Sequence, residues 1–118
     1  MAKTVLLVDD STFMRVKMKS LVEKLGYQVI GEGANGKEAV EKYKILRPDI
    51  LLMDITKPEM DGVEALRRIM GYDPKAVVVM VSAMGQERIV MDTVLAGAKN
   101  FIVKPYQDDK VADVLKSL

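Results

Sequence analysis

Short apolar runs alternate with segments of helical periodicity along the whole chain, and this alternation repeats five times. We expect strands at about residues 3–8, 28–32, 50–53, 76–81 and 100–103. Helices are expected from a cap at Ser11 or Thr12 to about residue 25, between the Asn35-Gly36 turn and Pro48, and at about residues 62–70, 86–96 and 108–118. The run at 76–81 shows no polar alternation, which is typical of a central strand covered on both faces.

The expected helices carry apolar residues at spacings of three and four, which marks the face that each one buries. These positions are Met14, Met18, Leu21 and Leu25 in the first helix, Ala39, Val40 and Tyr43 in the second, and Val111, Val114, Leu115 and Leu118 in the fifth. Gly26 ends the first helix, and Gly97 follows the fourth, as a left-handed residue at a helix C-terminus requires.

Strand and helix alternation needs right-handed crossovers, which leaves two common layouts for five parallel strands. One is the flavodoxin-like order, and the other is half of a dinucleotide-binding sheet. A dinucleotide site needs a glycine-rich turn after the first strand, whereas this chain has Asp9-Asp10-Ser11-Thr12, which repels a pyrophosphate unless a cation intervenes. We therefore predict one domain over residues 1–118, an α/β flavodoxin-like (βα)5 three-layer sandwich with parallel sheet order 2-1-3-4-5.

Composition narrows the chemistry that this chain can perform. The net charge is +1 from 18 basic and 17 acidic residues, so neither nucleic acid nor a membrane surface is expected as the main partner. There is no cysteine and no histidine, so any metal site must be built from oxygen ligands, which favours Mg²⁺, Mn²⁺ or Ca²⁺. The first residues lack a signal-peptide pattern, and no apolar run approaches the roughly 20 residues of a membrane span, so we expect a cytoplasmic protein.

Charged residues follow the apolar runs at the points where the expected strands end. Asp9 and Asp10 come directly after the first run, Asp54 after the third and Lys104 after the fifth. The carboxyl ends of parallel strands share one edge of a sheet, where ligands bind in open α/β folds. In the order 2-1-3-4-5, Asp54 comes beside Asp9 and Asp10, with Ser82 and Lys104 on the next strands out. We therefore expect a site for metal and phosphoryl chemistry at this edge.

Crowded carboxylates resist ionising together, and a divalent cation relieves their repulsion. Mg²⁺ takes one or two carboxylates together with phosphate oxygens and water. Without histidine, cysteine or a serine with a base, the available nucleophile is a carboxylate, and Asp54 can form an acyl phosphate. Lys104 then pairs with the transferred group, and Ser82 hydrogen-bonds to it. A single strand-end aspartate is more often a helix cap than a functional residue, and Ser82 taken alone is about as often a strand-end cap as a functional residue. The hypothesis therefore depends on the joint placement of these residues at one sheet edge.

Several motifs together resemble the receiver domain of two-component response regulators over the whole chain. They are Val8-Asp9-Asp10, Met53-Asp54, Pro58-Glu59-Met60-Asp61-Gly62, Ser82-Ala83, Gly97-Ala98 and Phe101-Ile102-Val103-Lys104-Pro105. Two segments, Ser82-Ala83-Met84-Gly85-Gln86 and Ala96-Gly97-Ala98-Lys99-Asn100-Phe101, are most similar to single-domain chemotaxis regulators of that family. That subgroup is itself a known example of the 2-1-3-4-5 order, so the fold and the resemblance are not independent predictions.

The resemblance implies a reaction and a cofactor. Asp54 would be phosphorylated by a histidine kinase, a CheA-like one in the chemotaxis subgroup. Mg²⁺ would be ligated by Asp10, Asp54 and the carbonyl of Thr56, with Asp9 holding it through water. The chain would then be a signalling phospho-acceptor rather than an enzyme with an external substrate, with autodephosphorylation its only other reaction.

The resemblance also implies how the phosphoryl group is held and sensed. Ser82 and the Ala83 amide would bind phosphoryl oxygens, Lys104 would form the ion pair, and the bond from Lys104 to Pro105 would be a cis peptide. Phe101 matches an aromatic whose inward or outward rotamer reports phosphorylation, and an inward rotamer would also suit a residue packed on the core.

Inward movement of Ser82 would free the space for Phe101, which carries the change to the face formed by the fourth helix, fifth strand and fifth helix. This face also carries Lys99 and Tyr106. Its partner would be a flagellar motor switch protein, acting in flagellar rotation, or another phospho-dependent protein, and the chain is expected to be a monomer.

One position departs from the family pattern. Lys57 stands where the family usually has methionine, and it either extends to solvent or adds positive charge beside the phosphoryl pocket.

Two other functions stay open. One alternative is the receiver domain of a longer DNA-binding regulator or a phosphorelay protein, although the chain ends inside the last helix without a linker, which favours a standalone protein. Another is an aspartyl phosphatase of the haloacid dehalogenase family, which has a second aspartate where Thr56 stands.

Overall fold

Five parallel strands form one sheet in the order β2-β1-β3-β4-β5, as the alternation predicted. The computed structural model describes residues 2–55, 61–83 and 87–118. The strands are β1 (Thr4–Val8), β2 (Gln28–Gly33), β3 (Ile50–Ile55), β4 (Val78–Ala83) and β5 (Asn100–Lys104). The helices are α1 (Thr12–Lys24), α2 (Gly36–Leu46), α3 (Asp61–Tyr72), α4 (Glu87–Leu95) and α5 (Asp108–Lys116).

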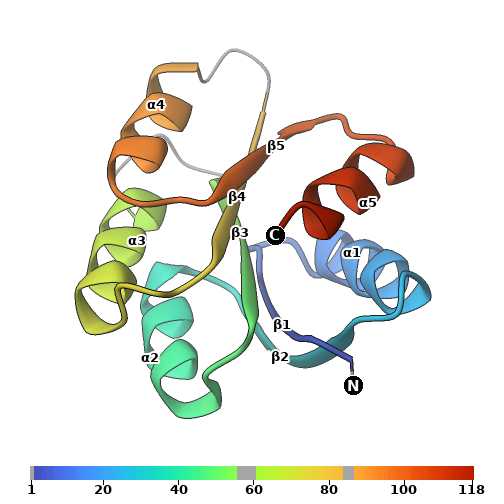
Figure 1. Ribbon diagram of the computed structural model, residues 1–118, viewed down its shortest axis with the longest axis horizontal. Helices are drawn as coiled ribbons and strands as arrows, with labels where there is room; N and C mark the ends of the chain where they lie inside the picture. Colours follow the sequence, from blue (N-terminus) through green and yellow to red (C-terminus); the bar gives the residue numbers. More distant parts are fainter. Residues whose placement is uncertain (1, 56–60, 84–86) are drawn as a thin grey trace.

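The helices cover both faces of the sheet and make a three-layer sandwich (Figure 1). Helices α1 and α5 pack on one face, against Val5, Leu7 and other alternate strand residues. Helices α2 and α3 pack on the opposite face, against Leu6, Val8 and the residues in register with them. Because successive strand residues point to opposite faces, a continuous apolar run fills both cores at once. This explains why β1, β3 and β4 show no polar alternation over their buried length.

Two strands extend further than the apolar runs predicted. Strand β3 continues through Asp54 and Ile55, which pair in register with Val81 and Ser82 of β4. Strand β4 in turn begins at Val78 and continues through Ser82 and Ala83, which pair with Val103 and Lys104. The backbone hydrogen bonds therefore persist after the sequence turns polar, and the predicted ends of these two strands, at residues 53 and 81, were each two residues short. The extension holds Asp54 and Ser82 on sheet backbone rather than in loops.

Local signals set several helix ends. Ser11 caps α1, and its hydroxyl accepts a hydrogen bond of 3.3 Å from the backbone nitrogen of Met14. Gly26 and Gly97 adopt positive φ angles of 98° and 113° after α1 and α4. Helix α2 ends at a left-handed Arg47 with φ of 46°, just before Pro48. Helix α3 extends two residues past the predicted end at residue 70. Helix α5 ends two residues before the predicted end at residue 118.

No helix within the described ranges is long and apolar enough to cross a membrane.

Candidate functional site

Asp54 lies on the central strand of the sheet and is almost completely buried, with 3% of its side chain exposed. Lys104, at the end of β5, extends across the intervening strand β4 and donates a hydrogen bond to Oδ2 of Asp54. The same ammonium group lies 3.9 Å from Oδ2 of Asp9, which follows β1. Three charged groups from three strands therefore meet at the carboxyl edge of the sheet.

Asp9 is held in place by the start of α1 and the end of β2. Its Oδ1 accepts a hydrogen bond of 2.9 Å from the backbone nitrogen of Ser11, the residue that also caps α1. Its own backbone nitrogen donates to the carbonyl of Gly33 at 3.0 Å. With Oδ1 engaged in this way, Oδ2 is the oxygen of Asp9 that faces Lys104.

Three buried polar atoms have no hydrogen-bond partner among the described residues: Oδ1 of Asp54, Oγ of Ser82 and the hydroxyl of Tyr106. Leaving such an atom unpaired costs roughly 1–3 kcal/mol, so native proteins rarely keep several without a use for them. The sheet register places Ser82 next to Ile55 on β3 and Val103 on β5. The Asp54 carboxylate oxygen and the Ser82 hydroxyl are thus buried, unpartnered polar atoms at the edge where a ligand would bind.

The surroundings of Asp54 favour its neutral form in the metal-free protein. Burial raises the pKa of Asp54 most strongly, and a hydrogen bond with Asp9 raises it further. Lys104 acts in the opposite direction, and the net result is a pKa of about 7 for Asp54. Burial, and then the negative charges of Asp9, Asp54 and Asp108, also raise the pKa of Tyr106.

The donor set suits a small hard cation. Asp54 and Asp9 supply two carboxylates within hydrogen-bonding range of each other. Mg²⁺ requires only one or two carboxylates, with water and phosphate oxygens completing its octahedron. Over residues 2–55, 61–83 and 87–118, no three acidic side chains are gathered into a ready-made cation cage.

The other residues singled out in the sequence occupy varied positions. Asp10 is exposed. Ala83 ends β4 and lies in register with Lys104, and the bond from Lys104 to Pro105 is cis. Thr56, the expected carbonyl ligand, and Lys57, the position that departs from the family pattern, lie outside the described residues.

Phe101 does not pack into the core, as the inward rotamer would require. It has 36% of its surface exposed and lines an open groove of about 520 Å³ between β5 and α5. Ile102 next to it is fully buried, because alternate residues of β5 face opposite sides of the sheet. Phe101 therefore adopts the outward arrangement in this structure, and of the two alternatives left open by the sequence, packing on the core does not hold.

Two residues of this site were not assigned to it from the sequence: Arg15 was not singled out, and Tyr106 was placed only on the expected partner face. Arg15 and Tyr106 line a cavity of about 20 Å³ below Asp9, Asp54 and Lys104, which has room for about one water molecule. Tyr106 follows Lys104 by two residues, so its place beside the fifth strand could have suggested it. Arg15 lies one helical turn after Ser11, but nothing in the sequence indicates which way its side chain turns.

Comparison with known proteins agrees with this geometry. The family model for the response regulator receiver domain matches residues 5–116. The chain is 52% identical to the chemotaxis protein CheY of Thermotoga maritima, over all of this chain and 98% of that protein. It is 50% identical to CheY of Bacillus subtilis, over 98% of this chain and 96% of that one. Among solved structures, the complex of CheX and CheY with BeF3 and Mg²⁺ from Borrelia burgdorferi matches with a TM-score of 0.90 and 43% identity, over 98% of this chain and 87% of that one.

The raised pKa of Asp54 predicts that the metal-free protein loses stability as the pH rises. The folded state binds one more proton than the unfolded state between the unfolded pKa of 3.8 and the folded pKa of about 7. The free energy of unfolding should fall across that window, by at most about 4 kcal/mol, and level off above it. Urea titrations with chelator at pH 5, 6, 7 and 8 measure this slope.

Asp54→Asn is the control for that measurement, because it keeps the shape of the side chain and removes its titration. The variant should show a flatter pH profile and exceed the wild type in stability at pH 8. Parallel profiles for the two proteins would contradict the assignment of the slope to Asp54.

Proposed function

Because the chain belongs to the response regulator receiver domain family, we propose that it accepts a phosphoryl group on Asp54 from a histidine kinase in the cytoplasm. The chain is a receiver domain closely related to CheY, a chemotaxis response regulator, and proteins of this kind act in signalling. The observation that carries the proposal is the buried Asp54 carboxylate, with one oxygen on Lys104 and the other unpartnered among the described residues.

The two oxygens of Asp54 have different roles in the proposed transfer. Oδ2 is engaged by Lys104, so Oδ1 is the oxygen available to attack phosphorus. The new Oδ1–P bond forms as the bond between phosphorus and the donor nitrogen of the kinase phosphohistidine breaks, and the electron pair stays on that nitrogen. The product is an acyl phosphate, and no further reactant is needed. The nucleophile must be ionised, which in the metal-free site requires a pH above the Asp54 pKa of about 7.

Groups at the sheet edge can stabilise the transferred charge. The Lys104 ammonium already lies in the site, within 3.9 Å of Asp9 and in contact with Asp54, so it can pair with phosphoryl oxygens without a large movement. We assign the buried Ser82 hydroxyl as a hydrogen-bond donor to another phosphoryl oxygen, and the Ala83 amide as a second donor. Both residues belong to β4, which lies between Asp54 on β3 and Lys104 on β5.

Asp10, Asp54 and the carbonyl of Thr56 would ligate Mg²⁺, and Asp9 would hold it through water, as the family resemblance implies. When bound, Mg²⁺ would neutralise the carboxylates and the charge that develops on the transferred oxygens. The residues of this chain would then orient the phosphoryl group between Lys104 on one side and the carboxylates on the other. The comparison structure from Borrelia burgdorferi contains BeF3 and Mg²⁺ with CheY.

Phospho-dependent binding of a protein partner is the output that the surface supports. Helix α4 and strand β5 expose five large apolar side chains: Met91, Val94, Leu95, Phe101 and Val103. Two of them, Phe101 and Val103, line the groove of about 520 Å³ between β5 and α5. Strand β5 also carries Lys104, so the proposed pocket and this face share one element. The kinase would be CheA-like, and the partner a flagellar motor switch protein or a protein comparable to the CheX in the Borrelia burgdorferi complex.

We expect Mg²⁺ to raise the melting temperature, because it binds only the folded arrangement of the acidic residues and relieves their repulsion. The gain should be larger at pH 8 than at pH 5, since protons compete with Mg²⁺ for Asp54 at low pH. Replacing Asp10 with asparagine should remove most of the gain. Thermal unfolding followed by circular dichroism measures this, and an unchanged Mg²⁺ response in Asp10→Asn would place the metal elsewhere.

Acetyl phosphate with Mg²⁺ should add one phosphoryl group to the protein, which intact-mass spectrometry detects directly. The acyl phosphate needs the Asp54 carboxylate, so Asp54→Asn should stay unlabelled. Excess chelator should also prevent labelling in the wild type. Full labelling of Asp54→Asn, or labelling that ignores the chelator, would contradict the proposed site.

A phosphoryl mimic should change the α4 and β5 surface as well as the pocket. Beryllofluoride with Mg²⁺ should shift amide resonances along β5 and α4, as Phe101 leaves its outward arrangement, and should tighten binding to a motor switch peptide by roughly 5- to 150-fold. Ser82→Ala should confine the shifts to the loops around Asp54, because Ser82 connects the phosphoryl group to β4. Shifts restricted to those loops in the wild type would refute the switch and leave the phosphorylation site standing.

A further inference from the structure

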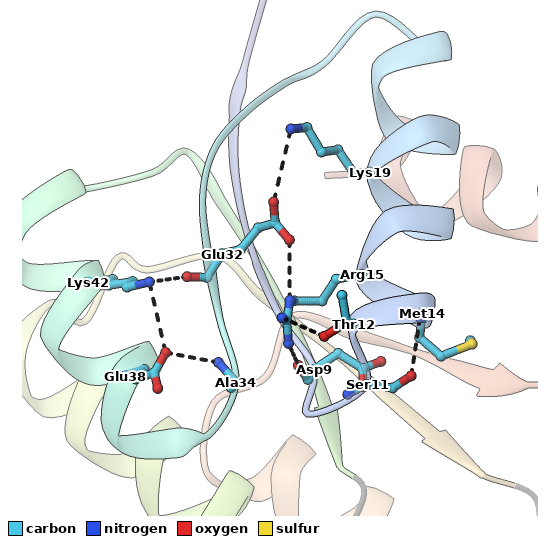
Figure 2. A network of polar contacts seen from close by, with 10 residues as sticks. All are labelled: Asp9, Ser11, Thr12, Met14, Arg15, Lys19, Glu32, Ala34, Glu38 and Lys42. Carbon is cyan, nitrogen blue, oxygen red and sulfur yellow. Dashed lines mark hydrogen bonds and ion pairs between the residues drawn. The ribbon is translucent and has the colours of Figure 1, made fainter.

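Glu32, the second-last residue of the edge strand β2, connects the two helical layers of the protein (Figure 2). Its carboxylate faces α1, where Oε1 accepts a hydrogen bond of 3.2 Å from Nε of Arg15 and Oε2 lies 4.0 Å from Nζ of Lys19. Its backbone carbonyl faces α2 and accepts a hydrogen bond from Lys42. Since α1 and α2 pack on opposite faces of the sheet, Glu32 ties both layers together around the sheet edge.

Arg15 extends this connection from Glu32 to Asp9, at the pocket that Asp9, Asp54 and Lys104 line. One arm of its guanidinium group donates to the backbone carbonyl of Asp9, and another donates to Oγ1 of Thr12 at 3.3 Å. Its Nε is engaged by Glu32, so the planar group spans the distance between β2 and the end of β1. The side chain is 17% exposed, less than half the exposed fraction of Glu32. A guanidinium fork with three fixed contacts has little rotational freedom left.

Every polar group of Asp9 except one carboxylate oxygen is thereby fixed. Gly33 accepts from its nitrogen, Arg15 donates to its carbonyl, and the Ser11 nitrogen donates to Oδ1. The remaining oxygen, Oδ2, is the one that faces Lys104 and the phospho-acceptor. The orientation of this oxygen is therefore set by the contacts that hold the rest of Asp9, and Arg15 supplies the one that connects Asp9 to Glu32 on β2.

We propose that Arg15, itself held by Glu32, is a positioning residue that aims Oδ2 of Asp9 and so sets the affinity of the pocket for Mg²⁺. The inference rests on the proposed function, in which Asp9, through water, holds the cation together with Asp10 and Asp54. A lysine could match the charge of Arg15, but it has no rigid fork to engage Glu32 and the Asp9 carbonyl together. Groups that orient metal-binding residues commonly change metal affinity by 10- to 100-fold when they are removed.

The test compares Mg²⁺ binding to five proteins by isothermal titration calorimetry with magnesium chloride. We expect Arg15→Gln to raise the Mg²⁺ dissociation constant roughly 10-fold. Glu32→Gln should raise it less, and the double variant should bind no more weakly than Arg15→Gln, because the two residues act in series. Arg68→Gln is the matched control, since it breaks an Arg–Glu pair of 3.1 Å on α3 that does not contact the pocket, and it should leave the constant unchanged.

A second measurement needs no metal and separates positioning from a merely structural role. In the metal-free proteins, Arg15→Gln should shift the amide resonances of Asp9 and Ser11, whereas Arg68→Gln should not. Wild-type Mg²⁺ affinity in Arg15→Gln, with or without a lower melting temperature, would overturn the proposal, and so would additive effects in the double variant. If Arg15→Gln does not fold, Arg15→Lys and Glu32→Gln carry the test, and wild-type affinity in both would overturn it.

The acetyl phosphate experiment distinguishes the failure of this inference from the failure of the proposed function. Wild-type protein that binds Mg²⁺ but is not labelled on Asp54 would refute phospho-acceptance, while the effect of Arg15 on Mg²⁺ binding would still stand. Labelling of Asp54 with unchanged Mg²⁺ affinity in Arg15→Gln would refute the positioning role alone.

Discussion

The ion pair between Lys104 and the buried Asp54 is the interaction on which the site depends. A carboxylate with 3% exposure next to a second carboxylate is unfavourable, and the pKa of about 7 for Asp54 measures how strongly the protein resists its ionisation. Lys104 offsets part of this cost because it reaches both Asp54 and Asp9. Lys104 does not offset the whole cost of ionising Asp54 beside Asp9. A bound cation would offset the rest by adding positive charge to the pocket.

The parallel sheet makes this pair possible. Lys104 and Asp54 are 50 residues apart in the chain, and only the pairing of β3 with β4 and of β4 with β5 brings them to the same edge. Apolar residues fill both faces of β1, β3 and β4, so the backbone that carries the charged residues cannot shift register without exposing a core. The two cores thus fix the geometry of the polar site.

The polar network around Glu32 extends this control to the open side of the sheet. Strand β2 lies at the edge and has no strand beyond it, so the cores constrain its end less than they constrain β3. Arg15, Lys19 and Lys42 hold Glu32 from both helical layers, and Arg15 passes the constraint to Asp9. The central and the edge strands therefore fix the pocket by different means, through apolar packing at Asp54 and through charged hydrogen bonds at Asp9.

Hydrophobic periodicity and the crossover rule predicted the two-faced core, and the acidic turn Asp9-Asp10-Ser11-Thr12 excluded the dinucleotide-binding layout. Together they left the order 2-1-3-4-5 and one edge at which Asp9, Asp54, Ser82 and Lys104 gather. The sequence pattern did not give the roles of Arg15 and Tyr106, the outward arrangement of Phe101 or the continuation of β3 and β4 through Asp54 and Ser82. Those features depend on side-chain direction and on hydrogen bonds between strands distant in the chain. Periodicity tells which face a residue occupies, whereas the contacts that a long side chain makes are decided only when the elements pack together.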